Sequence, residues 1–194
     1  MTETEYHAHF LNGISTIPED AFSEILKIAK LKDYKANTQI VKLNETPSKV
    51  YMLVSGIVRC YLSTESGKEF NKNFFLPISF FGSLTALLKK QPSLFVFEAL
   101  SDCRVYEVHY DKLMLLSKKH KSVNMLYSKV LESVYVAYEK RLIELISLDA
   151  TERYLEMRKQ IAQIDDLIPQ YHIASYLGIT PVQLSRIRKK IDGC

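Results

Sequence analysis

The spacing of apolar residues changes twice along the chain. It begins as helical, with Phe22, Ile25, Leu26 and Ala29 at the i, i+3, i+4 and i+7 positions of one helix face. This spacing predicts an amphipathic helix from about residue 18 to residue 31. The chain then changes to short β-type runs from about residue 34 to residue 109, and it returns to helical spacing from residue 121 onward.

The β-type runs are separated by turn residues such as Ser55-Gly56 and Ser66-Gly67. Closely spaced strands with tight turns are typical of an antiparallel sandwich or barrel. One segment differs, because Gly82–Leu88 predicts a short helix entered through a glycine. Together with the helical C-terminal part, the pattern predicts an α+β fold. The predicted strands are residues 39–43, 50–54, 57–62, 70–76, 94–100 and 103–108.

The helix that begins near Lys121 has two apolar stripes and continues for nearly thirty residues without proline or glycine. Both stripes have the alternating spacing of a coiled-coil seam. A helix with two apolar faces must bury both, so we expect one face on its own β domain and the other on a second copy of the chain. Burial inside one monomer is the alternative. The first stripe, assigned to the dimer, is Val123, Tyr127, Val130, Val134 and Ala137; the second is Leu131, Tyr135, Tyr138, Leu142 and Leu145.

A break in the helical pattern follows Leu148. Asp149 is followed three residues later by Glu152, which is the spacing of a capping box that starts a new helix. We expect a hinge here, followed by a helix that runs to about Ile164.

The residues from 168 to 191 predict two helices joined by a tight turn. Gly178 can adopt the left-handed conformation that such a turn needs. Thr180 is placed to cap the second helix, and Pro181 occupies its first position, where the missing N–H costs nothing. This is the pattern of a helix-turn-helix, in which the second helix enters the DNA major groove.

The second of these helices carries most of the excess positive charge of its region. Arg186 can form a bidentate contact with guanine, and Gln183 can contact adenine or the backbone. Phosphate contacts are expected from Thr180, Lys189 and Lys190. The alternative is a basic helical hairpin that does not contact DNA. The full set of predicted DNA-binding residues is Thr180, Gln183, Ser185, Arg186, Arg188, Lys189 and Lys190.

Composition excludes several classes of protein. Of the 194 residues, 47% are hydrophobic and 25% charged, which is typical of a globular protein and not of a disordered or fibrous one. No apolar run reaches the roughly 18 residues of a membrane span, and the acidic N-terminus lacks a secretory signal, so we expect no membrane partner and a cytoplasmic location. The three cysteines lack metal-ligand spacing, and a net charge of +4 is too small to identify a polyanionic partner by itself.

In its order of parts, the chain resembles the Crp/Fnr family of bacterial transcription regulators. The similar segments are Tyr51–Arg59, Phe81–Leu84, Leu148–Arg153 and Ser185-Arg186. The resemblance implies a cyclic-nucleotide-binding-like β-roll (residues 1–118), a long dimerisation helix (119–148) and a helix-turn-helix domain (149–194). It also implies a homodimer on double-stranded DNA at a palindromic site, with RNA polymerase as a further partner.

The segment that resembles the family's phosphate-binding cassette departs from the family pattern. Cyclic-AMP-binding members have a Glu that accepts the ribose hydroxyl and an Arg-Ser pair for the phosphate. The corresponding positions here are Ser83, Ser93 and Leu94. Without a guanidinium the buried phosphate would lack its main partner, so we expect an effector other than cyclic AMP, in a pocket at Gly82, Ser83, Leu84, Ser93 and Leu94.

The nature of that effector stays open from the sequence. The start of the short helix can attract an anion. A group of phenylalanines, at Phe74, Phe80, Phe81, Phe95 and Phe97, can either receive an apolar ligand or simply fill the core.

We expect no cofactor. The N-terminus lacks the cysteines of an iron–sulfur cluster, and the histidines show no pattern that favours haem ligation. An enzyme is disfavoured because catalytic groupings are missing from the sequence. The alternative function is a ligand-sensing or scaffold protein that acts through protein contacts, with a helix-turn-helix that no longer recognises DNA.

Overall fold

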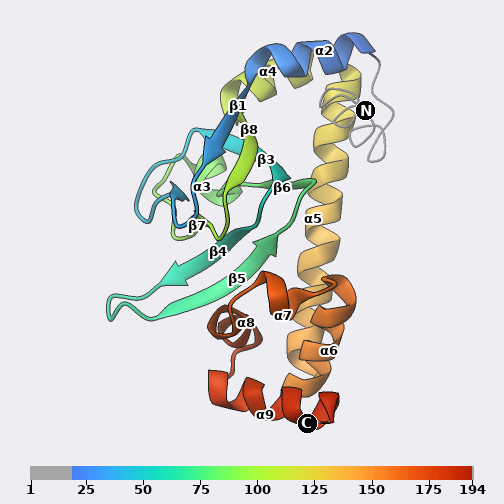
Figure 1. The fold of residues 1–194 in the computed structure, drawn as a ribbon. Coiled ribbons are helices and arrows are strands. Elements are labelled where there is room, and N and C mark those ends of the chain that lie inside the picture. Colours follow the sequence, from blue (N-terminus) through green and yellow to red (C-terminus); the bar gives the residue numbers. More distant parts are fainter. Residues whose placement is uncertain (1–18, 194) are drawn as a thin grey trace.

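The computed structural model describes residues 19–193 and shows two β-sheets beside one long helix (Figure 1). Pro18 and the residues before it lie outside the described part of the chain. The strands are β1 (Ala29–Tyr34), β2 (Gln39–Val41), β3 (Lys49–Ser55), β4 (Val58–Ser63), β5 (Glu69–Phe75), β6 (Ser79–Phe81), β7 (Val96–Ala99) and β8 (Cys103–His109). The helices are α2 (Glu19–Ile28), α3 (Leu84–Lys89), α4 (Tyr110–Lys119), α5 (Lys121–Ser147), α6 (Ala150–Gln160), α7 (Ile164–Leu167), α8 (Gln170–Leu177) and α9 (Pro181–Asp192).

The β-roll consists of two four-stranded sheets in the orders β1-β8-β3-β6 and β2-β7-β4-β5, with antiparallel pairing throughout. The inner faces of the two sheets form one core, in which Leu53, Val58 and Val105 have no exposed surface. The predicted α+β fold with an antiparallel β-roll is confirmed.

Pairing between distant strands changes the predicted boundaries at the start of the roll. The first helix ends at Ile28 and not near residue 31, because Ala29–Tyr34 pairs with β8 along its whole length. This strand lies at the sheet edge and is rich in lysine, so its local sequence does not resemble a strand. β6 and α4 were likewise not predicted, and the helix after Asp149 ends at Gln160 and not near Ile164.

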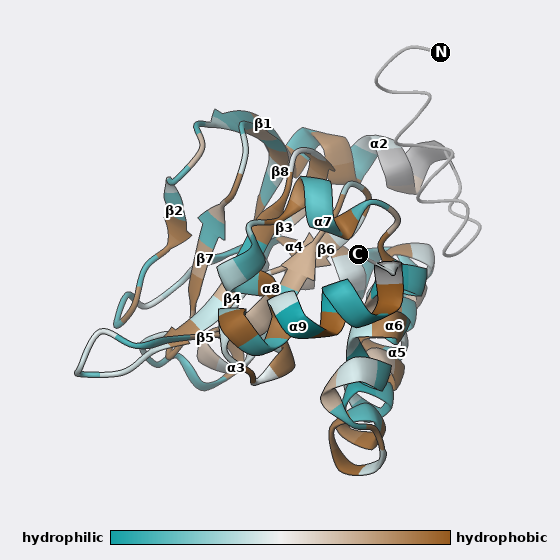
Figure 2. Cartoon of the chain, turned by 60° about the horizontal axis from the view of Figure 1, so that its bottom comes forward, coloured by the Kyte–Doolittle hydropathy of each residue, from teal (hydrophilic) through white to brown (hydrophobic). Residues whose placement is uncertain are grey.

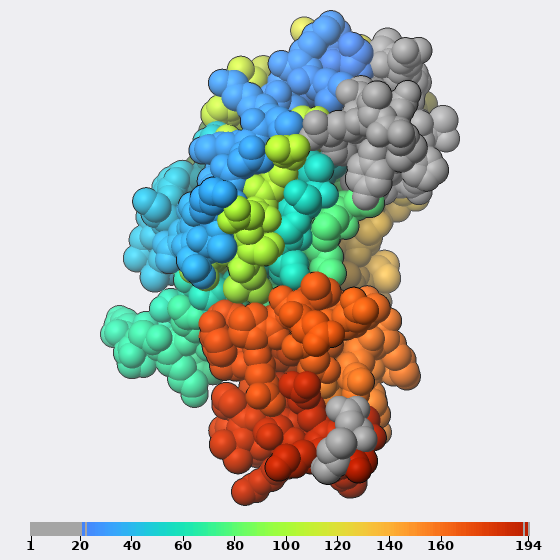
Figure 3. Space-filling model, viewed as in Figure 1, coloured from blue at the N-terminus to red at the C-terminus, as the bar shows by residue number. Residues whose placement is uncertain are grey.

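α5 extends along the side of the roll and ends beneath it, where the C-terminal helices begin (Figure 1). The N-terminal half of α5 packs with α2 and α4 on the outer face of β3, where Met52, Leu116, Val123 and Leu126 form a second core. The C-terminal helices have a third core, which Ile57 and Phe74 of the β-roll join. The space-filling view shows the C-terminal part, in orange and red, in contact with the roll above it (Figure 3).

Candidate functional site

The helix-turn-helix of α8 and α9 has the local structure that the sequence predicts. Gly178 adopts the left-handed conformation (φ 73°) and ends α8. Thr180 caps α9: its Oγ1 accepts a hydrogen bond from the Gln183 N–H (3.2 Å), and Gln183 Oε1 accepts one from the Thr180 N–H (2.8 Å). This reciprocal pair is a capping box. Ile173, Leu177 and Leu184 are fully buried between the two helices, so their mutual angle is set by packing.

The outer face of α9 is polar and positively charged. Arg186, Lys189 and Lys190 are exposed, and no residue in the described part of the chain forms an ion pair with any of them. Figure 2 brings this end of the molecule forward and shows polar residues on the outer side of α9. The positive charges are therefore available to an external polyanion.

Three other predicted DNA-binding residues take part in contacts within the chain. The Gln183 amide oxygen and the Thr180 hydroxyl are engaged with each other in the cap. Arg188 is only about one-third exposed, and its Nε lies 3.6 Å from Asp165 Oδ1 of α7. Ser185 is half-buried. Thr180 and Gln183 are exposed as well, but their polar side-chain atoms are engaged in the cap, whereas Arg186, Lys189 and Lys190 are exposed cations.

The helix-turn-helix is attached to the β-roll by a buried polar cluster that the sequence did not predict. His172 of α8 is 4% exposed, and its Nδ1 lies 3.2 Å from both Arg59 Nη1 and Asn71 Nδ2. Since both neighbours are donors, Nδ1 must be unprotonated and accept. Burial and the positive charge of Arg59 lower the pKa of His172 to about 4. The imidazole is therefore neutral at neutral pH.

The same contact covers the free edge of the second sheet. β5 is an edge strand, and the Ser175 hydroxyl accepts a hydrogen bond from the Asn71 N–H (3.0 Å) and donates one to the Glu69 carbonyl (3.0 Å). On the other side of α8, the guanidinium of Arg141 in α5 donates to the Tyr176 carbonyl (2.6 Å) and stacks on its ring. α8 is thus held between β5 and α5.

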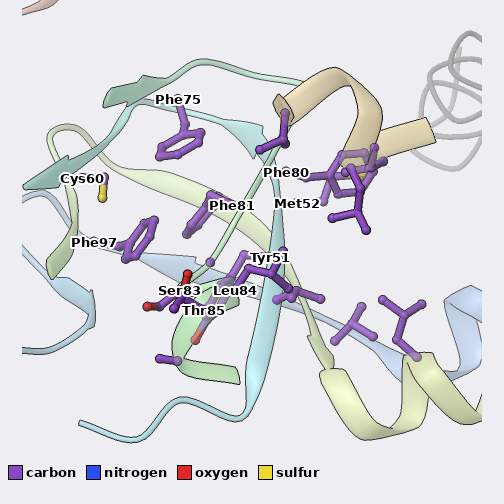
Figure 4. A pocket seen from close by; sticks show the side chains of 18 of the residues that line it. Tyr51, Met52, Cys60, Phe75, Phe80, Phe81, Ser83, Leu84, Thr85 and Phe97 are labelled. Carbon is purple, nitrogen blue, oxygen red and sulfur yellow. The ribbon is translucent and has the colours of Figure 1, made fainter. Parts of the chain in front are cut away.

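A large apolar cavity of about 380 Å³ lies between the β-roll and α5. In the close view, Phe75, Phe81 and Phe97 lie on one side of it, and Ser83, Leu84 and Thr85 at the start of α3 lie on another (Figure 4). Cavities of this size hold small ligands in many proteins. Of the phenylalanines singled out from the sequence, Phe80, Phe81, Phe95 and Phe97 line the cavity, whereas Phe74 packs against Tyr176 of α8.

The residues predicted for the effector pocket divide into two groups. Gly82, Ser83, Leu84 and Leu94 line the cavity, although Leu94 is 60% exposed. Ser93 is fully buried behind it, with its Oγ 2.9 Å from Ser83 Oγ and 2.8 Å from the Phe95 carbonyl oxygen. The two serines thus hydrogen bond to each other at the positions that the resemblance assigns to the ribose-binding Glu and the phosphate-binding Arg. The six-residue α3 makes no side-chain cap.

The stripe of α5 assigned to the dimer requires a correction. Val123 is 1% exposed and packs with Val130 on its own β-roll, and the Tyr127 hydroxyl lies 2.9 Å from that of Tyr110. Val123 therefore cannot contact a second copy, whereas Ala137, at the other end of this stripe, is exposed. The exposed large apolar side chains of α5 include Tyr135, Tyr138, Leu142 and Leu145 of the second predicted stripe. Those that are more than half exposed form what we call the α5 exposed stripe: Tyr135, Val136, Leu142, Ile143 and Ile146.

Cys60 and Cys103 are buried free thiols, and burial raises the pKa of Cys60 to about 12. Within residues 19–193, no cluster of His, Cys, Asp or Glu has the arrangement of a metal site. None of the described helices is long and apolar enough to cross a membrane.

Comparison with known proteins agrees with this architecture. Residues 31–120, which span β1 to β8 and α4, match the model of the cyclic nucleotide-binding domain. In this part, the chain is similar to the cyclic nucleotide-binding domain family. No curated protein sequence matches the chain significantly.

Solved structures of Crp/Fnr regulators share the fold of the cyclic nucleotide-binding domain and of the helices after it. FixK2 from Bradyrhizobium japonicum has 24% identity and a TM-score of 0.71, with 86% of this chain and 85% of FixK2 covered. A CooA mutant from Carboxydothermus hydrogenoformans has 19% identity and a TM-score of 0.72 (94% and 84% covered). The catabolite activator protein of Thermus thermophilus has 15% identity and a TM-score of 0.59 (95% and 87% covered). The predicted resemblance to the Crp/Fnr family is confirmed for the domain family and the fold.

Proposed function

We propose that this chain is a DNA-binding transcription regulator of the Crp/Fnr type. The observation that carries the proposal is the outer face of α9, where Arg186, Lys189 and Lys190 are exposed on a rigidly capped helix. A capped recognition helix with a positive outer face fits the DNA major groove. Arg186 is the candidate for base recognition, and the two lysines are candidates for phosphate contacts.

The regulator acts as a homodimer in this proposal, with α5 as the contact. The side chains of the α5 exposed stripe recur at helical spacing on one face, and each is more than half exposed. Burying such a stripe against a second copy removes apolar surface from water and sets two α9 helices side by side. Two recognition helices bind half-sites about 34 Å apart, so a palindromic site is expected.

The proposed effector is not cyclic AMP. Neither an arginine nor a carboxylate is among the described residues that line the cavity, and Ser83 and Ser93 are hydrogen bonded to each other. A ribose hydroxyl would lack a carboxylate partner there, and a buried cyclic phosphate would lack a guanidinium, because Lys72 is the one cation among the described residues that line the cavity.

The test first selects genomic DNA fragments that bind to the wild-type chain and are retained by it. The retained fragments are identified by sequencing. We expect the affinity of the chain for these fragments to fall steeply with salt concentration, because phosphate contacts release counterions. Arg186→Ala should lower the preference for these fragments over random DNA by about 1–3 kcal/mol for each recognition contact that is lost.

The matched control is Lys112→Ala, which removes an exposed positive charge from α4. This helix is distant in sequence from α9. It should leave affinity and preference unchanged. Retention of no fragments, or equal preferences for the wild type and Arg186→Ala, would contradict the proposal and favour a protein that acts through protein contacts.

A further inference from the structure

The cavity beside α5 carries one formal charge. Lys72 is the sole charged side chain among the described residues that line it, and the rest are apolar, aromatic or neutral polar residues. No carboxylate in the described part of the chain forms an ion pair with Lys72. An apolar cavity with one unpaired cation is complementary to an apolar molecule with one negative charge.

The local structure of β5 turns Lys72 toward the cavity. In the pairing of β4 with β5, Cys60 lies opposite Asn73 and Tyr61 lies opposite Asn71, so Lys72 is the extra residue of a β-bulge. A bulge redirects a side chain from the regular alternation of a strand. It allows the adjacent residues Lys72 and Asn73 both to line the cavity.

Two aromatic rings hold the Lys72 ammonium in place. It lies 4.0 Å from the ring centroid of Phe95, which precedes β7, and 5.1 Å from that of Tyr138 in α5. These cation–π contacts place the charge between the β-roll and the long helix. A ligand that pairs with Lys72 would therefore also touch α5, where Val130, Val134 and Tyr138 line the cavity.

We propose that this cavity binds an apolar carboxylic acid, with the carboxylate paired with Lys72 and the apolar body among the phenylalanines and the α5 side chains. Asn73, which also lines the cavity, would donate a second hydrogen bond to the carboxylate through its amide. As the effector of a DNA-binding regulator, such an acid would act through α5; that regulatory part rests on the proposed function, whereas the binding itself does not.

A nucleotide fits the same cavity poorly despite its negative charge. Its ribose and base carry several polar groups, and each needs a partner when it leaves water. A long alkyl or aryl acid has a single polar group, and Lys72 and Asn73 suffice for it.

The test is calorimetric titration of the full chain with straight-chain fatty acids from octanoic to tetradecanoic acid, and with the alcohols of the same lengths. We expect at least one acid to bind more tightly than its alcohol. Lys72→Met removes the ammonium and keeps an unbranched side chain one atom shorter. It should weaken binding of the acid by about tenfold or more and leave binding of the alcohol unchanged.

The matched control is Lys68→Met. The Lys68 ammonium also lies over an aromatic ring, 4.8 Å from the centroid of Phe70, but it does not line the cavity. This variant should bind acids as the wild type does, and circular dichroism should show both variants folded. Acids that bind no better than alcohols, binding of none of the acids, an unchanged affinity in Lys72→Met, or tighter binding of cyclic AMP would overturn the proposal.

A second measurement separates this proposal from the proposed function. DNA affinity is determined with and without the acid, on the genomic fragments that the chain retains. Acid binding that depends on Lys72, in a chain that retains no DNA, would support the ligand and contradict the regulator. DNA binding without acid binding would support the regulator and contradict the ligand.

Discussion

Individual buried charges decide how the C-terminal helices attach to the β-roll. Arg59 is 5% exposed, yet it lies 2.5 Å from Glu69, 2.8 Å from Glu98 and 3.2 Å from the His172 imidazole. Its guanidinium also stacks on Tyr61. The pairing keeps the cost of burying the charge low, and it places a donor where α8 needs one.

Arg59→Met should lower the free energy of unfolding by about 3–5 kcal/mol, because Glu98 is left buried without its cationic partner. Urea denaturation measures the loss. Arg104→Met is the control: this arginine is exposed and pairs with Asp33 at 2.9 Å, so it should cost about 1 kcal/mol or less. Equal losses for the two variants would contradict the role assigned to Arg59.

Among individual residues, the sequence predicts the roles of those whose contacts lie within a few positions along the chain. Gly178, Thr180 and Pro181 define the turn and the cap of α9 through contacts within a few residues. Arg59, Lys72 and His172 carry no such signal. Their roles depend on a bulge and on contacts between residues about 100 positions apart in sequence, such as Arg59 and His172, and no local pattern encodes those.

Among the elements, α8 connects DNA recognition to the β-roll. It packs on β5 through His172 and Ser175 and on α5 through Tyr176, while the following helix, α9, faces outward. A change in this docking would move α9 relative to α5. The polar cluster around His172 is therefore a place where protonation affects the attachment.

Protonation of His172 should destabilise the folded chain in acid. Its folded pKa of about 4 lies below the usual value of 6.5, so the unfolded chain binds more protons between these values and stability is lost as the pH falls from 6.5 to 4. The groups that face the imidazole are Arg59 from β4, Glu69 and Asn71 from β5, and Tyr171 on α8 itself.

The measurement compares thermal melting from pH 7 to pH 4 in the wild type and in His172→Gln, which accepts a hydrogen bond but does not titrate. The variant should lose less stability over this range than the wild type. His109→Gln, a change at an exposed histidine, should keep the wild-type slope. Parallel curves for the wild type and His172→Gln would show that His172 does not contribute.

Elements with strong periodicity were predicted well, and those fixed by pairing were not. The long helix, the capping box at Asp149 and most strands follow from spacing alone. β1 did not, because its Ala29-Lys30-Leu31-Lys32 sequence favours a helix and pairing with β8 overrides that preference. The face of α5 that meets the roll also depends on tertiary packing, so the stripes were distinguishable only in the structure.

In the whole molecule, the cavity lies against α5 from Val123 to Tyr138, and the C-terminal helices with α9 follow the other end of α5. The α5 exposed stripe lies in the C-terminal half of the same helix. Two chains joined along this stripe would present two α9 helices to one duplex. Dimerisation thus connects the effector site to DNA recognition, and it is the central claim.

Footprinting of the chain on its retained genomic fragments tests this claim most directly. We predict two protected patches separated by about one helical turn, roughly 34 Å, because each protomer places one α9 in the major groove. The variant Ile143→Glu with Ile146→Glu puts charge into the α5 exposed stripe and should lose the paired footprint, whereas Leu115→Glu, on exposed α4 surface, should keep it. A single protected patch in the wild type, or a paired footprint that survives the double substitution, would contradict the account.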